Sequence, residues 1–392
     1  MVKPTDAELD KLTPHLFLFQ DPVSTLLPHA AHDPSLDSLF DPIAALPQFK
    51  DISFGVVLYK GATEVRAYLH RPDENWDIGS GGKTSILTAA VVLRNDLRVL
   101  MANGLITAAN ADVLLRYVWT RHNLRDIKKL SIGSNYPQPS QMFDFSQSPI
   151  DFEGGPSDFD FLKTLAPHTI KPNDLRAITF RDRLHLTIGH SDNRAARASQ
   201  GQLGIAYINA VLQHLGLYSP MPDNGLRVAG PYSVRDTDLP TGWRQPVAIK
   251  RALGQGAGGR VTDIPYCATA RTLAMLMTSM VRNTFPGAEG PKGLREFLLK
   301  RSDFSYRSFA LEGVQLARQQ MGLSDVPTIA YSKLGILWAN EEFLYVEFGP
   351  IRFGLVMLGL LPKRINNEPW HGGARGWDLA KNLYPVIHGL PW

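Results

Sequence analysis

The chain has 392 residues, of which 44% are hydrophobic and 20% are charged, with Lys+Arg 41 against Asp+Glu 37 and a net charge of +4. This composition excludes disordered, fibrous and repeat classes, and the length allows one large or two to three small domains at roughly 100–200 residues each. The single cysteine, Cys267, excludes an intrachain disulfide and a cysteine-rich zinc site. The mild positive charge permits attraction of anionic substrates, but no Lys/Arg block marks a nucleic-acid-binding arm.

The amino-terminal segment carries no targeting or membrane signal. Its only apolar stretch, Leu16–Phe19, is much shorter than a signal-peptide core or the ~20 residues of a membrane-spanning helix. We therefore expect a soluble chain without a membrane span. The chain as written predicts a cytoplasmic protein, or a periplasmic or extracellular one if a leader was removed, and the sequence leaves this choice and the oligomeric state open.

The first predicted elements are a short helix at 36–46 and a β-hairpin, after an N-terminal extension at 1–35. The hairpin consists of Ser53–Lys60 and Thr63–His70, which are rich in branched and aromatic residues and separated by Gly61-Ala62. Apolar/polar alternation and a tight glycine turn are typical of antiparallel pairing.

A long helical block follows. From Lys83 to Ala102 the pattern is apolar around most of a helix circumference, which indicates a central, buried helix. Helical periodicity recurs at 109–120, 172–187, 204–216 and 267–282, and Pro/Gly/Ser/Asp-rich stretches at 133–158 and 217–262 predict long surface loops.

The end of the chain returns to strands, at 328–336, 343–348 and 351–361, with a last helix at about 376–388. Because strands from both ends can join one sheet, we expect an α+β fold (an α/β sandwich) in which a five-stranded antiparallel sheet is flanked by helices and interrupted by a large all-α insert. The α/β part would comprise 36–75 and 325–392, and the helical part, with its long loops, would comprise 76–324.

Ser80-Gly81-Gly82-Lys83 stands at the start of the predicted buried helix. Positions i and i+3 share one helix face, so the hydroxyl and the amine can meet. Burial lowers the pKa of a lysine, and a neutral lysine can take a serine proton as general base. By itself the pattern favours a simpler interpretation, in which the serine caps the helix and the lysine is solvated.

Two further motifs fall at junctions of this plan. Ser191-Asp192-Asn193 lies between two helical stretches, where the same residue types also serve as caps. Lys333-Leu334-Gly335 lies within a predicted strand, and a glycine in a strand interior often marks close approach of a ligand or another backbone. The alternative for Lys333 is an exposed edge lysine.

Taken together, the three motifs resemble those of the serine β-lactamase and penicillin-binding protein superfamily, most closely its class A β-lactamase-like branch. That family places S-x-x-K at the head of a buried helix, S-D-N between helices and K-T-G on a strand. The sequence around Ser191 and the helix at 204–216 look especially similar. The resemblance covers about residues 36–390, so 36–392 would form one catalytic unit.

The resemblance implies a serine hydrolase that forms an acyl-enzyme from a small-molecule or peptide amide or ester, without a metal or organic cofactor. Ser80 would be the acylated nucleophile and Lys83 the base that activates it. Ser191 would relay a proton toward the leaving group, and Asn193 would orient Lys83 or hold the substrate amide.

The third motif would complete the site. By the same resemblance, Lys333 would supply positive charge, and the backbone N–H groups of Ser80 and of Ile336, the residue after Gly335, would bind the oxyanion. Leu334 departs from the family pattern, because it replaces a hydroxyl residue that commonly holds the carboxylate of a β-lactam.

A second departure concerns deacylation. Class A β-lactamases use a loop glutamate after S-D-N to activate water, and here no Glu occurs between Glu153 and Glu289. Asp223, Asp236 and Asp238 lie where that residue would be sought, but none sits in a recognisable motif. The sequence therefore predicts slow β-lactam hydrolysis.

Two other functions compete with this one. Gly79–Thr84 nearly spells a phosphate-binding loop, but Asp77 stands where that pattern needs glycine, and no buried hydrophobic strand precedes it. Gly254–Gly259 matches G-x-G-x-x-G by spelling only and is interpreted as a flexible loop. The last alternative, a non-catalytic binding module on the same fold, does not explain why Ser80, Lys83, Ser191, Asn193 and Lys333 are all present.

The scattered histidines do not support a metal site, because they show no convincing ligand spacing; these are His185, His190, His214 and His371.

Overall fold

The structure is a computed structural model. It describes residues 3–22, 31–61, 64–121, 136–153, 178–189, 191–220, 223–228, 266–282, 284, 308–336, 340–360 and 372–392. Several predictions concern positions outside these residues: most of the loop at 217–262 with Asp236 and Asp238, both ends of the loop at 133–158, the segment Gly254–Gly259, and both His190 and His371.

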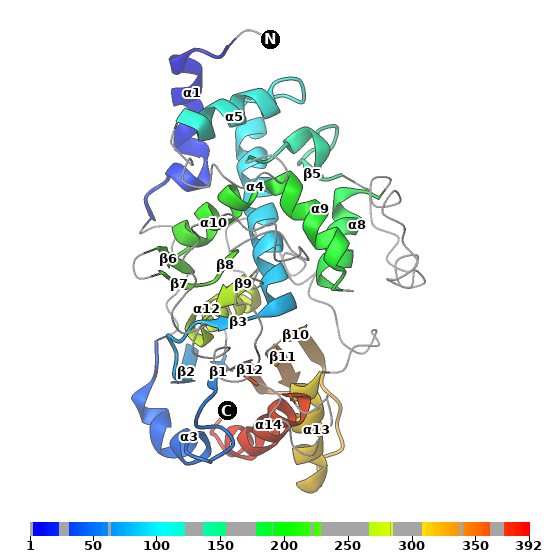
Figure 1. Cartoon of the computed structure of the whole chain (residues 1–392). Helices are drawn as coiled ribbons and strands as arrows, with labels where there is room; N and C mark the ends of the chain where they lie inside the picture. Colours follow the sequence, from blue (N-terminus) through cyan, green and yellow to red (C-terminus); the bar gives the residue numbers. More distant parts are fainter. Residues whose placement is uncertain are drawn as a thin grey trace, which may run out of the picture.

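A five-stranded antiparallel sheet is built from both ends of the chain, in the order β10-β11-β12-β1-β2 (Figure 1). Its members are β1 (Ser53–Lys60), β2 (Glu64–His70), β10 (Ile329–Ile336), β11 (Asn340–Phe348) and β12 (Ile351–Leu358). The central pairing joins β1 to β12, with Val56 opposite Leu355. The predicted α+β class and sheet are confirmed.

The two faces of the sheet contact two separate cores. Val56 and Leu58 of β1 belong to the core shared with the helices drawn below the sheet in Figure 1, whereas Val57 and Tyr59 belong to the core shared with the helical part. This alternation follows the two-residue period of a strand. The helices of the lower layer are α3 (Asp37–Ala44), α13 (Phe309–Gln320) and α14 (Gly372–His388).

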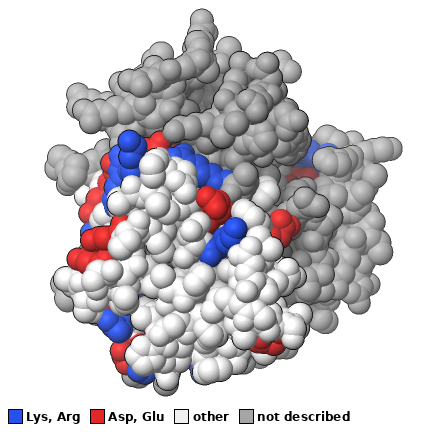
Figure 2. Space-filling view, turned by 90° about the horizontal axis from the view of Figure 1, so that it is seen from below, with Lys and Arg blue, Asp and Glu red and all other residues white. Residues whose placement is uncertain are grey.

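The lower layer forms the face seen in Figure 2. Most of its described surface belongs to uncharged residues, and basic and acidic side chains lie interspersed among them. One ion pair here joins Arg375 of α14 to Asp51, in the segment that leads into β1.

The helical part is organised around α4 (Thr84–Ala102), which runs through its centre (Figure 1). The helices around it are α1 (Asp6–Leu12), α5 (Ala111–Arg121), α8 (Phe180–Ile188), α9 (Asn193–Leu203), α10 (Ile205–His214) and α12 (Ala270–Arg282). The short 3-10 helices are η1 (Thr13–His15), η2 (Phe17–Phe19), η3 (Pro34–Leu36), η4 (Gly79–Lys83) and η6 (Pro139–Gln141).

The amino-terminal segment packs onto this central helix. Leu9, Leu12 and Phe17 are buried in the core that contains α4, and the backbone N–H of Phe17 donates to the buried Asp96 carboxylate at 3.0 Å. Within the described residues, no helix combines the length and apolarity needed to cross a bilayer.

Short strands that the sequence does not predict supplement the helical part. They are β3 (Trp76–Asp77), β8 (Arg227–Val228) and β9 (Tyr266–Ala268), which form a small sheet, and the hairpins β4 (Phe143–Asp144)–β5 (Asp151–Phe152) and β6 (Tyr218–Pro220)–β7 (Asp223–Gly225).

The helix expected at 267–282 is wrong at its start, because Cys267 pairs with Asp77 and Arg227 in this small sheet and the helix begins at Ala270. Two-residue strands carry no readable periodicity, and they exist here because distant segments pair.

Candidate active site

The turn η4 carries both Ser80 and Lys83 and leads directly into α4. Ser80 is partly exposed, whereas Lys83 is fully buried. The turn lies tightly against β9, because a Cβ at Gly82 would come within 2.2 Å of the Tyr266 side chain. A glycine at position 82 is therefore required for this close packing.

Lys83 is held by the loop between α8 and α9. Its ammonium nitrogen, Nζ, donates to Asn193 Oδ1 at 2.8 Å, to Ser191 Oγ at 3.2 Å and to the Ser191 backbone carbonyl. These three acceptors match the three donors of a charged lysine. A neutral lysine has two donors and a lone pair, so loss of its proton would let it accept a hydrogen bond from a hydroxyl.

Ser191 joins the two lysines of the predicted site. Lys333 Nζ donates to Ser191 Oγ at 2.9 Å, on the hydroxyl that Lys83 also contacts, and to the Leu334 carbonyl at 3.0 Å. Lys333 is 4% exposed, so the interpretation as an exposed edge lysine is wrong. The backbone of Ser191 has φ +55°, a left-handed conformation that non-glycine residues seldom adopt.

The next residue, Asp192, explains why the loop takes this shape. Its carboxylate caps α9 by accepting hydrogen bonds from the backbone N–H groups of Arg194 and Ala195, both at 2.8 Å. Asn193 is thereby the first residue of the helix. The capping role expected for this residue type is fulfilled by Asp192, and Ser191 and Asn193 contact Lys83.

The local charges act on the protonation of Lys83. Burial lowers the pKa of Lys83 well below its ordinary value, the positive charge of Lys333 lowers it further, and Asp192 acts weakly in the opposite direction. Burial and Lys333 thus both make the Lys83 proton easier to lose than that of an ordinary lysine.

Strand β10 brings the third motif against η4. At Gly335 a Cβ would lie 2.4 Å from the carbonyl oxygen of Ile78, the residue just before η4. The close backbone approach expected at this glycine is present. Ile336 is the last residue of β10, so the structure brings the strand of the third motif to the turn that contains Ser80.

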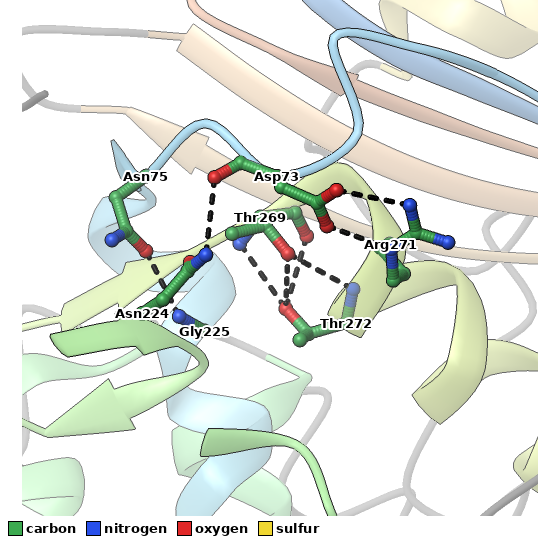
Figure 3. A network of polar contacts seen from close by, with 7 residues as sticks. All are labelled: Asp73, Asn75, Asn224, Gly225, Thr269, Arg271 and Thr272. Carbon is green, nitrogen blue, oxygen red and sulfur yellow. Dashed lines mark hydrogen bonds and ion pairs between the residues drawn. The ribbon is translucent and has the colours of Figure 1, made fainter. Parts of the chain in front are cut away.

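The segment that leads into Ser80 is anchored by a polar network (Figure 3). Asp73 forms an ion pair with Arg271 at the start of α12, with contacts of 2.7 and 3.0 Å, and its carbonyl accepts from Asn224 at 3.2 Å. Asn75 accepts from the Gly225 N–H at 3.0 Å. Hairpin β6–β7 and α12 thus fix the chain just before β3.

Sequence reasoning missed two carboxyl groups beside η4, Asp77 and Glu341. They are 4% and 1% exposed. The sequence uses Asp77 only as an argument against a phosphate-binding loop, and it predicts no role for Glu341. The only signal was that Glu341-Glu342 directly precedes the apolar run that begins at Phe343, and acidic residues are rarely buried without a reason.

No protein-family model matches the sequence, and no curated protein matches it. Among solved structures, the chain is similar to a variant of the last common ancestor of Gram-negative bacterial class A β-lactamases, with 15% identity, TM-score 0.45, and 90% of this chain and 100% of that one covered. It is also similar to the β-lactamase from Streptomyces albus G, with 19% identity, TM-score 0.44, and 89% and 98% covered. The class A β-lactamase from Mycobacterium abscessus gives 14% identity, TM-score 0.42, and 91% and 99% covered.

Proposed function

We propose that the protein is a serine hydrolase that forms an acyl-enzyme on Ser80 from an amide or ester substrate. The observation that supports this most is the convergence of Lys83, Ser191, Asn193 and Lys333, from three separate parts of the chain, beside the turn that contains Ser80. This convergence is what the three motifs imply and what a solvated lysine and an ordinary helix cap would not produce.

Acylation begins with attack of Ser80 Oγ on the substrate carbonyl carbon. Neutral Lys83 takes the hydroxyl proton as the O–C bond forms, and Asn193 orients the amine. The buried position of Lys83 and the charge of Lys333 support this role, since both lower the pKa of Lys83.

Collapse of the tetrahedral intermediate breaks the bond to the leaving nitrogen or oxygen, which needs a proton. Ser191 is suited to deliver it, because its hydroxyl contacts Lys83, which then carries the proton taken from Ser80. Lys333, on the other side of the same hydroxyl, fixes the orientation of Ser191 and adds positive charge.

The oxyanion of the intermediate would be bound by the backbone N–H groups of Ser80 and Ile336. The packing of β10 against η4 supports this assignment. Removing one donor of such a pair costs about 3 kcal/mol in the transition state. Leu334 in place of a hydroxyl residue, and the lack of a recognisable deacylating glutamate, make slow β-lactam turnover part of the proposal.

The nucleotide-binding alternative is disfavoured by one contact. The Gly79 N–H, which a phosphate-binding loop would present to its phosphate, donates to Asp77 Oδ1 at 2.9 Å. A buried carboxylate at this point also repels phosphate.

The test is covalent labelling. Incubation with a fluorescent penicillin and, separately, a fluorophosphonate should give an adduct on the Ser80 peptide by mass spectrometry, and Ser80→Ala should abolish it. No adduct with either probe, or equal labelling of Ser80→Ala, would overturn the proposal. Thermal stabilisation by Mg-ATP or Mg-GTP without any adduct would favour the nucleotide alternative.

A further inference from the structure

The Glu341 carboxyl lies inside the junction between β10 and η4. It projects from β11 opposite Gly335, and a Cβ at Gly335 would fall 1.3 Å from Glu341 Oε1. The carboxyl group thus fills the space that the glycine leaves open. On the η4 side, a Cβ at Gly81 would lie 3.7 Å from the same oxygen, so Glu341 is also next to the turn that contains Ser80.

The same space contains a backbone carbonyl. The Ile78 oxygen is 2.4 Å from the position of that Gly335 Cβ, so the Glu341 carboxyl and the Ile78 carbonyl lie side by side. Two acceptor oxygens at such close range repel each other unless a proton lies between them. A protonated Glu341 can donate to the Ile78 oxygen, which also accepts the Gly81 N–H at 2.7 Å, whereas an ionised Glu341 has nothing to donate.

Asp77 holds the other end of the same peptide unit. Its Oδ1 accepts the N–H of Gly79 at 2.9 Å, and Gly79 adopts φ +42° as the chain turns into η4. The peptide that joins Ile78 to Gly79 therefore has one buried carboxyl group at its N–H and another at its C=O. Ser80 is the next residue.

The two acids also differ in protonation. Burial and the charge of Asp77 raise the pKa of Glu341 well above its ordinary value, while Lys333 on β10 and the Gly81 amide on η4 act in the opposite direction. Burial raises the pKa of Asp77 to about 6, against the Gly79 hydrogen bond. At neutral pH a pKa of about 6 leaves Asp77 mainly ionised, and burial together with the Asp77 charge favours the protonated form of Glu341.

We propose that Asp77 and Glu341 are positioning residues that clamp the Ile78–Gly79 peptide and thereby fix the backbone of Ser80 for attack and for oxyanion binding. The inference rests on the proposed function of Ser80 and deepens it. The clamp consists of the carboxylate of Asp77 on the N–H and the carboxylic acid of Glu341 on the C=O. Loss of the Glu341 proton turns one attractive contact into a repulsive one, directly before the nucleophile.

The first test is the pH dependence of Ser80 acylation by the fluorophosphonate in wild type, Glu341→Gln and Glu341→Leu. Gln keeps a donor for the Ile78 carbonyl at every pH, whereas Leu has none. We expect Glu341→Leu to acylate about tenfold to a hundredfold more slowly at neutral pH. The wild-type rate should decline at alkaline pH as Glu341 loses its proton. Glu341→Gln should recover most of the rate lost in Glu341→Leu and should show no such decline.

Glu342→Gln is the matched control. Glu342 is the adjacent residue on the opposite face of β11, where it accepts from Ser308 and from the Ala310 N–H at 3.0 Å at the start of α13. This variant should leave the pH profile of acylation unchanged, whatever it does to stability. Equal profiles for wild type and Glu341→Gln, or equal rates for Glu341→Leu and wild type, would overturn the clamp.

A second readout is independent of activity. A carboxyl group whose folded pKa is raised binds a proton that the unfolded chain releases, so stability falls as pH rises from the ordinary carboxyl range through the folded pKa. The thermal midpoint of the wild type should fall over this window, and Glu341→Gln should fall less. If Ser80 is never labelled but this difference in the thermal midpoint appears, the proposed function fails and the acid pair stands. If wild type and Glu341→Gln show the same dependence of the thermal midpoint on pH, the acid pair itself is contradicted.

Discussion

Two groups of like charge flank the turn η4, and they are built differently. The lysine group, Lys83 and Lys333, is joined through the Ser191 hydroxyl and makes hydrogen bonds to side chains and backbone. In the acid group, Asp77 accepts the Gly79 N–H, and the Glu341 carboxyl lies beside the Ile78 carbonyl and the turn η4.

Burial has opposite effects on the proton in the two groups. It lowers the pKa of Lys83, which favours loss of a proton, and raises the pKa of Glu341, which favours keeping one. In each group a buried member is driven toward the neutral form by its like-charged neighbour. Lys333 acts on both, so the groups are coupled through one cation. The lysine group is suited to move protons, and the acid group to hold backbone.

The largest effect should come from removing the amine of the lysine group. Lys83→Met keeps the length and apolar stem of the side chain but has no base, so acylation of Ser80 should slow by about 10²–10⁴-fold. The measurement is the second-order rate constant of fluorophosphonate labelling at pH 7.

Lys60→Met is the control for Lys83→Met. Lys60 is an exposed lysine at the end of β1, and its side chain donates to the Pro391 carbonyl. It should label at the wild-type rate. A Lys83→Met protein that is folded by thermal unfolding and labels as fast as this control would remove Lys83 from the mechanism.

A smaller effect is expected at the cation that the two groups share. Lys333→Met removes a charged hydrogen bond to Ser191, a loss of about 1.5–3 kcal/mol, or about tenfold to a hundredfold in rate. It also removes the positive charge that lowers the pKa of Lys83. Because only the neutral amine acts as base, the rising limb of the acylation pH profile should move to higher pH. A limb that stays in place or moves to lower pH would contradict the coupling of the lysines.

The sequence predicts the lysine group better than the acid group, for a physical reason. Lys83, Ser191 and Lys333 sit in short motifs whose order and flanking periodicity carry information. Asp77 and Glu341 belong to no motif, and only the pairing of β11 with β10 and the packing of η4 bring them together.

The fold shows the same division. Long periodic segments such as α4 and the strand β1 are predicted to within one residue, because one face or one alternation repeats, whereas β12 ends at Leu358, before the predicted end at 361. The strand β3 is not predicted, since its hydrogen bonds depend on β9, far along the chain, and the strands of the hairpin β6–β7 are too short to show an alternation. These short elements anchor the segment before Ser80.

The smallest effect concerns the backbone of the loop that holds the lysine group. Ser191→Ala and Ser191→Gly both remove the hydroxyl that links Lys83 to Lys333, so both should slow acylation to the same extent. They differ in backbone strain, because Ser191 has φ +55°. Glycine adopts this conformation without a steric penalty, so Ser191→Gly should be about 1 kcal/mol more stable than Ser191→Ala by urea unfolding. As a control, Ala195→Gly, within helix α9, should instead lower stability by about 0.5–1 kcal/mol. If Ser191→Gly is less stable than Ser191→Ala, the loop is not strained at Ser191.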